Sequence, residues 1–360
     1  MLGAVRRRFN DRLQLLMDQK SRQALLSSRP RLGYIGALGD SNLGDEVMFT
    51  AAKQLYPDYE LVTLLSDWRE DDLATKGLSG PDFFSGVILG GGTLVGPYWL
   101  PKIAHAQRQK CTIWTLGTGV GSSGFSDELS VPLDGWLDVL ASMKQVGLRG
   151  PRSVAALANI GFTRAEPVGD LAAALTLAVP QELQAPHKII INIAADPADS
   201  REAVDIPCLL ALSNYLRLAH QFGTEIVPVI MHHSDAGPTH RFLDAAGLHH
   251  AKVNMPEDFS AFARCVNGAA FMVSVRLHGT ILAACCGVPS VSLGYRDKNL
   301  DFMESVGLGA FHVALETATL DATTEALKQM ESQCVTLRGD LHDSMLGLKS
   351  RLIRYVQGGK

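Results

Sequence analysis

The amino-acid sequence predicts an α/β protein built from two doubly wound, Rossmann-like domains that face each other across a cleft. Its 360 residues exceed the size of a typical single domain. From Arg31 onward, short apolar runs alternate with glycine-containing turns and helical stretches, as in buried parallel strands joined by right-handed crossovers. A proline-bearing connector over 180–187 separates two such series, which places the domain boundary near residue 180.

The strands are predicted from continuous apolar runs, because strands buried on both faces of a parallel sheet carry no polar alternation. The first domain, residues 31–180, has such runs at 32–35, 86–89, 112–116 and 145–148. The second domain, residues 181–315, has them at 188–193, 225–230, 269–275 and 290–293, with helices expected at 208–221 and 280–286. The last segment, 316–360, has helical spacing of apolar residues over 322–355, and a crossing back to the first domain is one course open to it.

Composition and charge narrow the function classes. The formal net charge of -4 supplies no basic field, so the sequence argues against nucleic-acid binding. Six cysteines without a CxxC pair favour a reducing cytoplasm, and neither a signal peptide nor an 18-residue apolar stretch is visible. We therefore expect a cytoplasmic protein.

The segment 1–30 is predicted to form a basic amphipathic helix, because arginines and lysines alternate there with apolar residues. Two interpretations stay open for this helix. It packs on the first domain as an ordinary solvated helix, or it gives the protein peripheral contact with the inner face of the membrane.

The most informative stretch is Val-Arg-Leu-His-Gly-Thr at 275–280. It lies where a buried strand is expected to end and an apolar helix to begin. Free amides at a helix start favour negative charge, and a guanidinium binds a phosphate or carboxylate bidentately. An imidazole moves protons near neutral pH. Arg276 and His278 therefore predict an anion-binding catalytic site.

The first half carries three weaker motifs at predicted strand ends. Asn42 or Asp45 is suited to cap a helix beginning near Glu46, and the neighbouring Gly44 lets backbone amides approach a ligand. Glycines at 90–92 follow a strand, and we favour close ligand approach at Gly91 and Gly92 over a simple tight turn.

Arg149 ends another predicted strand, just before a proline suited to the first turn of a helix. We expect this arginine to point into the cleft, and the alternative is a surface ion pair. The sequence His-His-Ser-Asp at 232–235 invites a metal hypothesis, which we reject because adjacent residues of an extended chain point to opposite faces. No metal ligands are assigned.

Taken in order, these motifs resemble the polysaccharide pyruvyl transferase family. The matching segments are Asn-Leu-Gly-Asp at 42–45, Gly-Gly-Gly at 90–92, Arg-Gly-Pro-Arg-Ser at 149–153, Arg-Leu-His-Gly at 276–279, Gly-Val-Pro at 287–289 and Tyr-Arg-Asp-Lys at 295–298. The resemblance implies a GT-B-like pair of domains, with the acceptor on the first and the donor on the second. It implies phosphoenolpyruvate as donor and a sugar of a cell-surface polysaccharide, or its lipid-linked precursor, as acceptor. The product is a pyruvate ketal, and no cofactor is required.

The resemblance also implies roles for individual residues. Arg149 and Arg276 bind the phosphate and carboxylate of the donor, and His278 is the general acid or base. The other substrate-binding positions are Asn42, Gly44, Asp45, Gly91, Gly92, Leu277, Gly279, Tyr295 and Lys298.

Two alternatives use the same architecture. In a nucleotide-sugar glycosyltransferase, Arg276 and Lys298 bind a diphosphate. In a non-catalytic binding protein, the fold is kept without the chemistry.

Overall fold

The computed structural model describes residues 28–39, 41–64, 81–121, 133, 135–179, 188–194, 206–294, 297–315 and 317–358. The expected N-terminal basic helix lies outside these ranges except for its last three residues, and Tyr295 lies outside them as well. Within the described ranges, none of the helices joins the length and the apolar character that crossing a bilayer requires.

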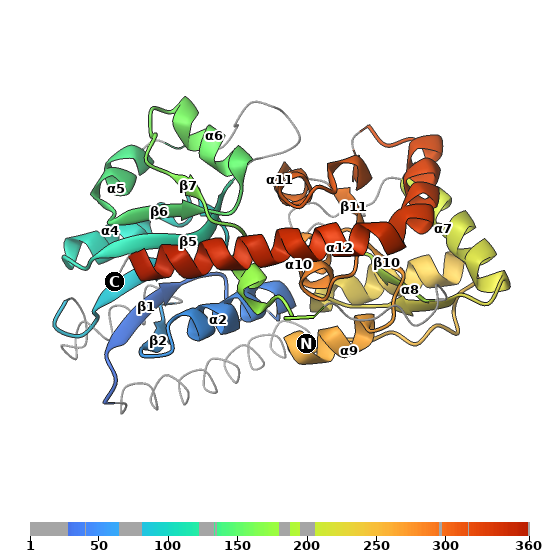
Figure 1. Ribbon diagram of the computed structural model, residues 1–360, viewed down its shortest axis with the longest axis horizontal. Helices are drawn as coiled ribbons and strands as arrows, with labels where there is room; N and C mark the ends of the chain where they lie inside the picture. The colour runs from blue at the N-terminus through green and yellow to red at the C-terminus, as the bar shows by residue number, and fades with distance from the viewer. Residues whose placement is uncertain are drawn as a thin grey trace, which may run out of the picture.

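The first sheet is parallel, in the order β2-β1-β3-β5-β6-β7, with β4 paired to β5 (Figure 1). Its strands are β1 (Arg31–Ile35), β2 (Glu60–Thr63), β3 (Gly86–Leu89), β4 (Gly92–Val95), β5 (Ile113–Val120), β6 (Gln145–Leu148) and β7 (Glu166–Pro167). The associated helices are α2 (Leu43–Leu55), α4 (Leu100–Arg108), α5 (Trp136–Ser142), α6 (Pro151–Asn159) and the 3₁₀ helix η1 (Leu171–Leu175). The predicted bounds of β3 and β6 are confirmed, whereas β5 runs four residues further than predicted because its end pairs with β4, which was not predicted.

The second sheet is also parallel, in the order β12-β11-β10-β8-β9. Its strands are β8 (Lys188–Asn192), β9 (Glu225–Pro228), β10 (Phe271–Ser274), β11 (Ser290–Gly294) and β12 (His312–Ala314). Its helices are α7 (Ile206–Gln221), α8 (Ala236–Ala245), α9 (Phe259–Val266), α10 (Leu277–Cys285) and α11 (Asp297–Ser305), with 3₁₀ turns η2 (His233–Asp235) and η3 (Gly309–Phe311). Two parallel sheets with helical crossovers confirm the predicted α/β class.

Helix α10 is apolar on all sides because it is enclosed on all sides. Eight of its nine residues are buried, and it packs on β10, β11, η1, α2 and the C-terminal helix. A helix that faced water would need a polar face. The start of α10 lies against the start of α2, so this helix joins the second sheet to the first domain.

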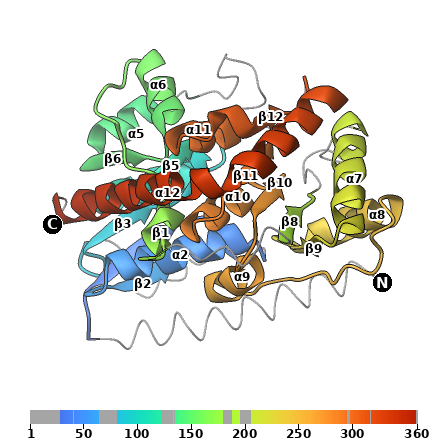
Figure 2. The same ribbon diagram turned by 45° about the vertical axis from the view of Figure 1, so that its right-hand side comes forward.

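The C-terminal helix α12 (Leu320–Gly358) contacts both sheets, as Figures 1 and 2 show. Near its middle, the Arg338 guanidinium donates to the carbonyl oxygens of Ala269 and Gly287 in the second domain. Near its end, Tyr355 Oη donates to Thr115 O of β5 at 2.8 Å. One continuous helix therefore fixes the two sheets relative to each other.

A second link joins α11 to the start of α6. Asp301 is 2% exposed, and its carboxylate accepts the Arg152 N–H at 2.9 Å and the Ser153 hydroxyl at 3.2 Å. A carboxylate from the second domain thus satisfies helix-start donors in the first, where the helix dipole favours negative charge. Arg152 also pairs with the more exposed Glu304 at 2.9 Å.

We expect Asp301→Ala to lower the free energy of unfolding by about 2 kcal/mol, because a buried charged hydrogen bond and a helix-start contact are lost together. Urea unfolding measures this change. Glu304→Gln is the matched control, and we expect it to cost no more than about 1 kcal/mol because its ion pair is exposed to water. Equal costs for the two variants would contradict the buried role of Asp301.

Candidate active site

The junction between β10 and α10 places Arg276 and His278 at the carboxyl edge of the second sheet. The strand ends at Ser274 and the helix begins at Leu277, three residues before the predicted start. Hydrogen bonds to the Arg276 backbone, one from the neighbouring strand β8 and one from Ser274 of β10 itself, explain the difference. Asn192 Oδ1 accepts the Arg276 N–H at 3.1 Å, and the Ser274 hydroxyl donates to Arg276 O at 2.8 Å. His278 and Gly279 therefore lie in the first helical turn.

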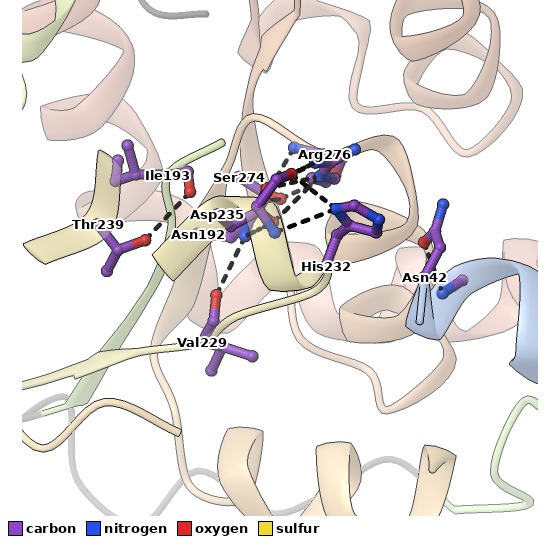
Figure 3. Close-up of polar contacts among 11 residues, drawn as sticks. Asn42, Asn192, Ile193, Val229, His232, Asp235, Thr239, Ser274 and Arg276 are labelled. Carbon is purple, nitrogen blue, oxygen red and sulfur yellow. Dashed lines mark hydrogen bonds and ion pairs between the residues drawn. The ribbon is translucent and has the colours of Figure 1, made fainter. Parts of the chain in front are cut away.

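The Arg276 guanidinium is held by Asp235 (Figure 3). Its Nη2 lies 2.6 Å from Asp235 Oδ1, and its Nε donates to both carboxylate oxygens at 3.1 Å. Asp235 is fully buried, and Asn192 Nδ2 donates to it at 3.3 Å. One edge of the guanidinium is thus oriented by a buried carboxylate. Asn192 and Asp235 were not among the predicted site residues, because only the fold brings β8 and η2 beside β10.

The His232 and His233 rings are 4.1 Å apart, so the expectation that they point to opposite faces is wrong. The chain leaves the extended conformation at this point, since the 3₁₀ turn η2 begins at His233. Ser234 hydrogen-bonds to one ring nitrogen of His232: the Ser234 N–H donates to Nδ1 at 3.2 Å, and the Ser234 hydroxyl oxygen lies 2.6 Å from the same nitrogen. Among the described residues, no group of three or more His, Cys, Asp or Glu side chains is arranged to hold a metal ion.

The start of α2 forms the opposite wall of the site. Asn42 is the cap, as predicted, and its Oδ1 accepts the Gly44 N–H at 3.1 Å. The helix begins at Leu43, earlier than expected, because the Leu43 N–H donates to Met231 O of the second domain at 2.9 Å. This backbone hydrogen bond shows that the two domains meet at this loop.

His278 packs directly on Gly44. A Cβ atom at Gly44 would overlap the imidazole ring, so only glycine permits this contact. His278 Nε2 is buried and makes no hydrogen bond to the protein. Burial lowers the pKa of His278 to about 3, and the positive charges of Lys298, Arg149 and Arg276 add to the effect. The imidazole is therefore neutral at physiological pH and can accept a proton.

Arg149 is a second buried group with unmet hydrogen-bonding capacity. It is 3% exposed, and its Nε and Nη1 make no hydrogen bond to the protein. A guanidinium in the interior is normally paired and hydrogen-bonded, so these donors point to a ligand anion. The alternative prediction for Arg149, a surface ion pair, is wrong because the side chain is buried. Its guanidinium fits against Gly119, where a Cβ atom would lie 2.5 Å from Nη2.

Asp170 is a buried neighbour that was not among the predicted site residues. It is 1% exposed; its Oδ1 accepts the Ala172 N–H at 2.9 Å, and its Oδ2 has no hydrogen-bond partner. Burial raises the pKa of Asp170, and the nearby charge of Arg149 opposes that shift. The available signal was an aspartate directly before the wholly apolar run 171–175.

Asp45 lies on the first turn of α2 and is half-buried. Burial raises its pKa to about 7, Lys298 and Arg276 oppose the shift, and the negative charges of Glu46 and Asp170 support it. Lys298, on α11, is half-buried and near enough to influence both Asp45 and His278. The structure thus gathers predicted residues from both domains around His278.

The glycines at 90–92 are required by the protein itself. A Cβ atom at Gly90 would overlap the Tyr34 ring, and one at Gly91 would overlap Met48 Sδ. Gly92 has a positive φ of 96°, and it starts β4. Ligand approach at Gly91 and Gly92 stays a prediction. The Leu277 side chain is 4% exposed, so of its atoms only the backbone is suited to a ligand.

We expect Gly44→Ala to lower catalytic activity at least tenfold, because the new methyl group displaces the imidazole and misplaced catalytic groups lose rate steeply. The measurement is kcat together with the melting temperature. Gly339→Ala on α12 is the matched control, since its Cβ meets nothing within 4 Å, and we expect unchanged activity and a small gain in stability. Full activity in Gly44→Ala would contradict the packing of His278 on this glycine.

Known proteins resemble this chain in sequence family and in fold. The family model described as polysaccharide pyruvyl transferase matches residues 42–297. Among solved structures, S. aureus MnaA with UDP has a TM-score of 0.56 at 11% identity, over 88% of this chain and 91% of that one. UDP-GlcNAc 2-epimerase from Neisseria meningitidis bound to UDP-GlcNAc has a TM-score of 0.55 at 13% identity, over 92% and 100%.

A third similar structure is a mutant of the Thermobaculum terrenum O-GlcNAc transferase, with a TM-score of 0.53 at 10% identity. The match covers 91% of this chain, which spans 66% of the length of that protein. At these identities the likeness concerns the fold alone, and it confirms the predicted GT-B-like pair of Rossmann-like domains. A search of curated protein sequences finds no match.

Proposed function

The chain belongs to the polysaccharide pyruvyl transferase family, and we propose that it transfers the pyruvyl unit of phosphoenolpyruvate to a sugar as a ketal. The acceptor is a sugar of a cell-surface polysaccharide or of its lipid-linked precursor. One observation carries this proposal: two buried nitrogens of the Arg149 guanidinium make no hydrogen bond to the protein, and Arg149 lies near the neutral imidazole of His278. A small, highly charged donor needs such cations, and proton transfer needs such an imidazole.

Each residue has a chemical task in this reaction. Arg149 and Arg276 bind the phosphate and carboxylate of the donor, with Asp235 holding the Arg276 guanidinium in place. First-turn amides of α10 and the charge of Lys298 stabilise negative charge on the departing phosphate. Neutral His278 removes the proton from the attacking sugar hydroxyl. A second hydroxyl of the same sugar then displaces phosphate and closes the ketal.

Cellular location and membrane contact belong to the same proposal. All six cysteines are free thiols, which agrees with a reducing cytoplasm. Membrane contact through the basic segment 1–30 would bring the enzyme to a lipid-linked acceptor. Loss of that contact on deleting residues 1–27 would support it, and unchanged vesicle binding would contradict it.

The test is phosphate release from phosphoenolpyruvate with a panel of oligosaccharide and lipid-linked acceptors. Acceptor-dependent release, with a product that gains the mass of a pyruvate ketal, establishes the reaction. Thermal stabilisation separates the alternatives, because a ligand that binds only the native state raises its stability. Stabilisation by UDP or GDP and none by phosphoenolpyruvate would favour a nucleotide-sugar glycosyltransferase. Phosphoenolpyruvate binding without turnover on any acceptor would favour a non-catalytic binding protein.

A further inference from the structure

The proposed reaction needs two proton transfers, and His278 accounts for only one. The methylene carbon of phosphoenolpyruvate must gain a proton to become a methyl group, while the attacking sugar hydroxyl must lose one. A neutral imidazole accepts the hydroxyl proton, but at physiological pH it carries no additional proton to donate. Another group near His278 must therefore donate. The inference below rests on the proposed function.

Three carboxylates on the first-domain side are candidates by position, and two are engaged elsewhere. Glu46 Oε1 accepts the Gly39 N–H at 2.9 Å, which turns this side chain towards the loop before α2. Asp170 is 1% exposed, and one of its oxygens caps η1. Asp45 is half-buried, so part of its side chain is open to a ligand.

Asp45 also has the right neighbours. It directly follows Gly44, on whose backbone the His278 ring packs, so the two side chains start from touching segments of opposite domains. Its Oδ1 lies close to Gly92 at the turn between β3 and β4: a Cβ atom added to this glycine would be 3.6 Å from Oδ1. The charged and titratable groups that act on it are Lys298, Glu46, Asp170, Arg276 and Tyr34.

We propose that protonated Asp45 donates its proton to the methylene carbon of phosphoenolpyruvate while His278 takes the proton of the attacking sugar hydroxyl. The C–H bond forms as the Asp45 O–H bond breaks, and the electron pair of the carbon–carbon double bond supplies the new bond. The hydroxyl oxygen bonds to the central carbon, which then carries methyl, carboxylate, phosphate and sugar oxygen. When the second hydroxyl attacks, its proton passes to the Asp45 carboxylate, and phosphate leaves with its bonding pair and takes the proton held by His278. Both groups thereby return to their starting states, with one hydroxyl proton on phosphate and the equivalent of the other on the new methyl group.

The electrostatics favour Asp45 as the proton donor and His278 as the proton acceptor. Burial raises the pKa of Asp45 to about 7, so its proton is present below neutral pH and lost above it. Bound phosphoenolpyruvate adds negative charge nearby and raises this pKa further, so donor binding itself loads the acid. The same negative charge raises the pKa of His278 from its value of about 3, so the imidazole is a stronger base with the donor bound, and it is neutral at any pH above its pKa. Rate should therefore fall on the alkaline side only.

Asp45→Asn tests the proposal. We expect kcat to fall about 100-fold, within the range for loss of a general acid. Phosphoenolpyruvate affinity should be unchanged below neutral pH, where Asp45 is already neutral, and tighter above it, where the variant lacks the carboxylate charge. The alkaline limb of the kcat profile should disappear in Asp45→Asn. Asp45→Glu should recover at least part of the rate and restore a shifted limb. Glu46→Gln is the matched control: it should keep the wild-type rate below neutral pH, with an alkaline limb that is still present and lies at lower pH because the negative charge of Glu46 helps to raise the pKa of Asp45.

The raised pKa of Asp45 also predicts how the stability of the protein depends on pH. The unfolded carboxyl loses its proton near pKa 3.8 and the folded one near 7, so the native state of the wild type loses stability as pH rises between these values. The melting temperature of Asp45→Asn should therefore exceed that of the wild type by a margin that grows from about pH 4 to about pH 7. A margin independent of pH would contradict the raised pKa.

Other outcomes separate this inference from the proposed function. If wild-type protein makes the ketal and Asp45→Asn keeps more than a third of its kcat, or keeps the alkaline limb unchanged, Asp45 is not the proton donor. If wild-type protein binds UDP and releases no phosphate from phosphoenolpyruvate with any acceptor, the proposed function fails and this inference fails with it.

Discussion

Replacing His278 with alanine is expected to reduce kcat for ketal formation by about 10³-fold while phosphoenolpyruvate affinity changes little. The imidazole is neutral and unpartnered at Nε2, so its loss removes the base that accepts the hydroxyl proton. Steady-state kinetics and donor binding by calorimetry measure the two quantities separately. A large rise in KM with unchanged kcat would instead make His278 a binding residue.

The fold should survive this change. The His278 ring packs on Gly44 and is half-buried, so its removal should cost about 1–2 kcal/mol of unfolding free energy. His312→Ala is the matched control. Burial and the charge of Arg152 lower the pKa of His312 to about 4, but its charged neighbours are Arg152 and Glu304, not the cations around His278. Normal kcat in His278→Ala, or an equal loss in His312→Ala, would remove His278 from the mechanism.

Replacing Arg149 with methionine is expected to lower kcat/KM for phosphoenolpyruvate by about 10²–10⁴-fold, because each charged hydrogen bond contributes about 1.5–3 kcal/mol and a guanidinium makes two to an anion. The guanidinium is 3% exposed, so water cannot replace the missing donors easily. Methionine preserves much of the side-chain volume against Gly119. Steady-state kinetics measure the loss in kcat/KM, and calorimetric titration with the donor measures the loss of binding.

Arg149→Met is also expected to lose stability, and a double variant separates that loss from the loss of donor binding. Without Arg149, the buried Asp170 loses the cation that lowers its pKa, and an unpaired buried charge costs about 3 kcal/mol or more. Asp170→Asn removes that charge, so Arg149→Met with Asp170→Asn should regain most of the melting temperature without regaining donor binding. A double variant that binds phosphoenolpyruvate as the wild type does would exclude Arg149 as the anion ligand.

The architecture explains why the site needs both domains. Asp301 of the second domain caps α6 of the first, Leu43 N–H bonds to Met231 O, and α12 contacts both sheets. These contacts surround the residues gathered about His278. The proposed base therefore comes from one domain and the proposed acid from the other, and their spacing depends on how the domains are held.

The sequence by itself determined the fold class, most strand positions and the location of the central motif. Strand β3 was predicted because a continuous apolar run bounded by glycine is a local property, present before any contact forms. Arg276 and His278 were found for the same reason, since both sit at a strand-to-helix junction readable from neighbouring residues. Asn42 was recognised as one of two candidate caps, with Asp45, and the structure decided between them.

Only the tertiary structure decided how these pieces act together. The early start of α10, the buried partners Asn192 and Asp235, and the buried Asp170 depend on segments far apart in sequence. Gly44 is required by a side chain from the other domain, which no local pattern encodes. The protonation states follow the same rule. Burial and neighbouring charges set the pKa values of Asp45 and His278, and both are properties of the folded chain.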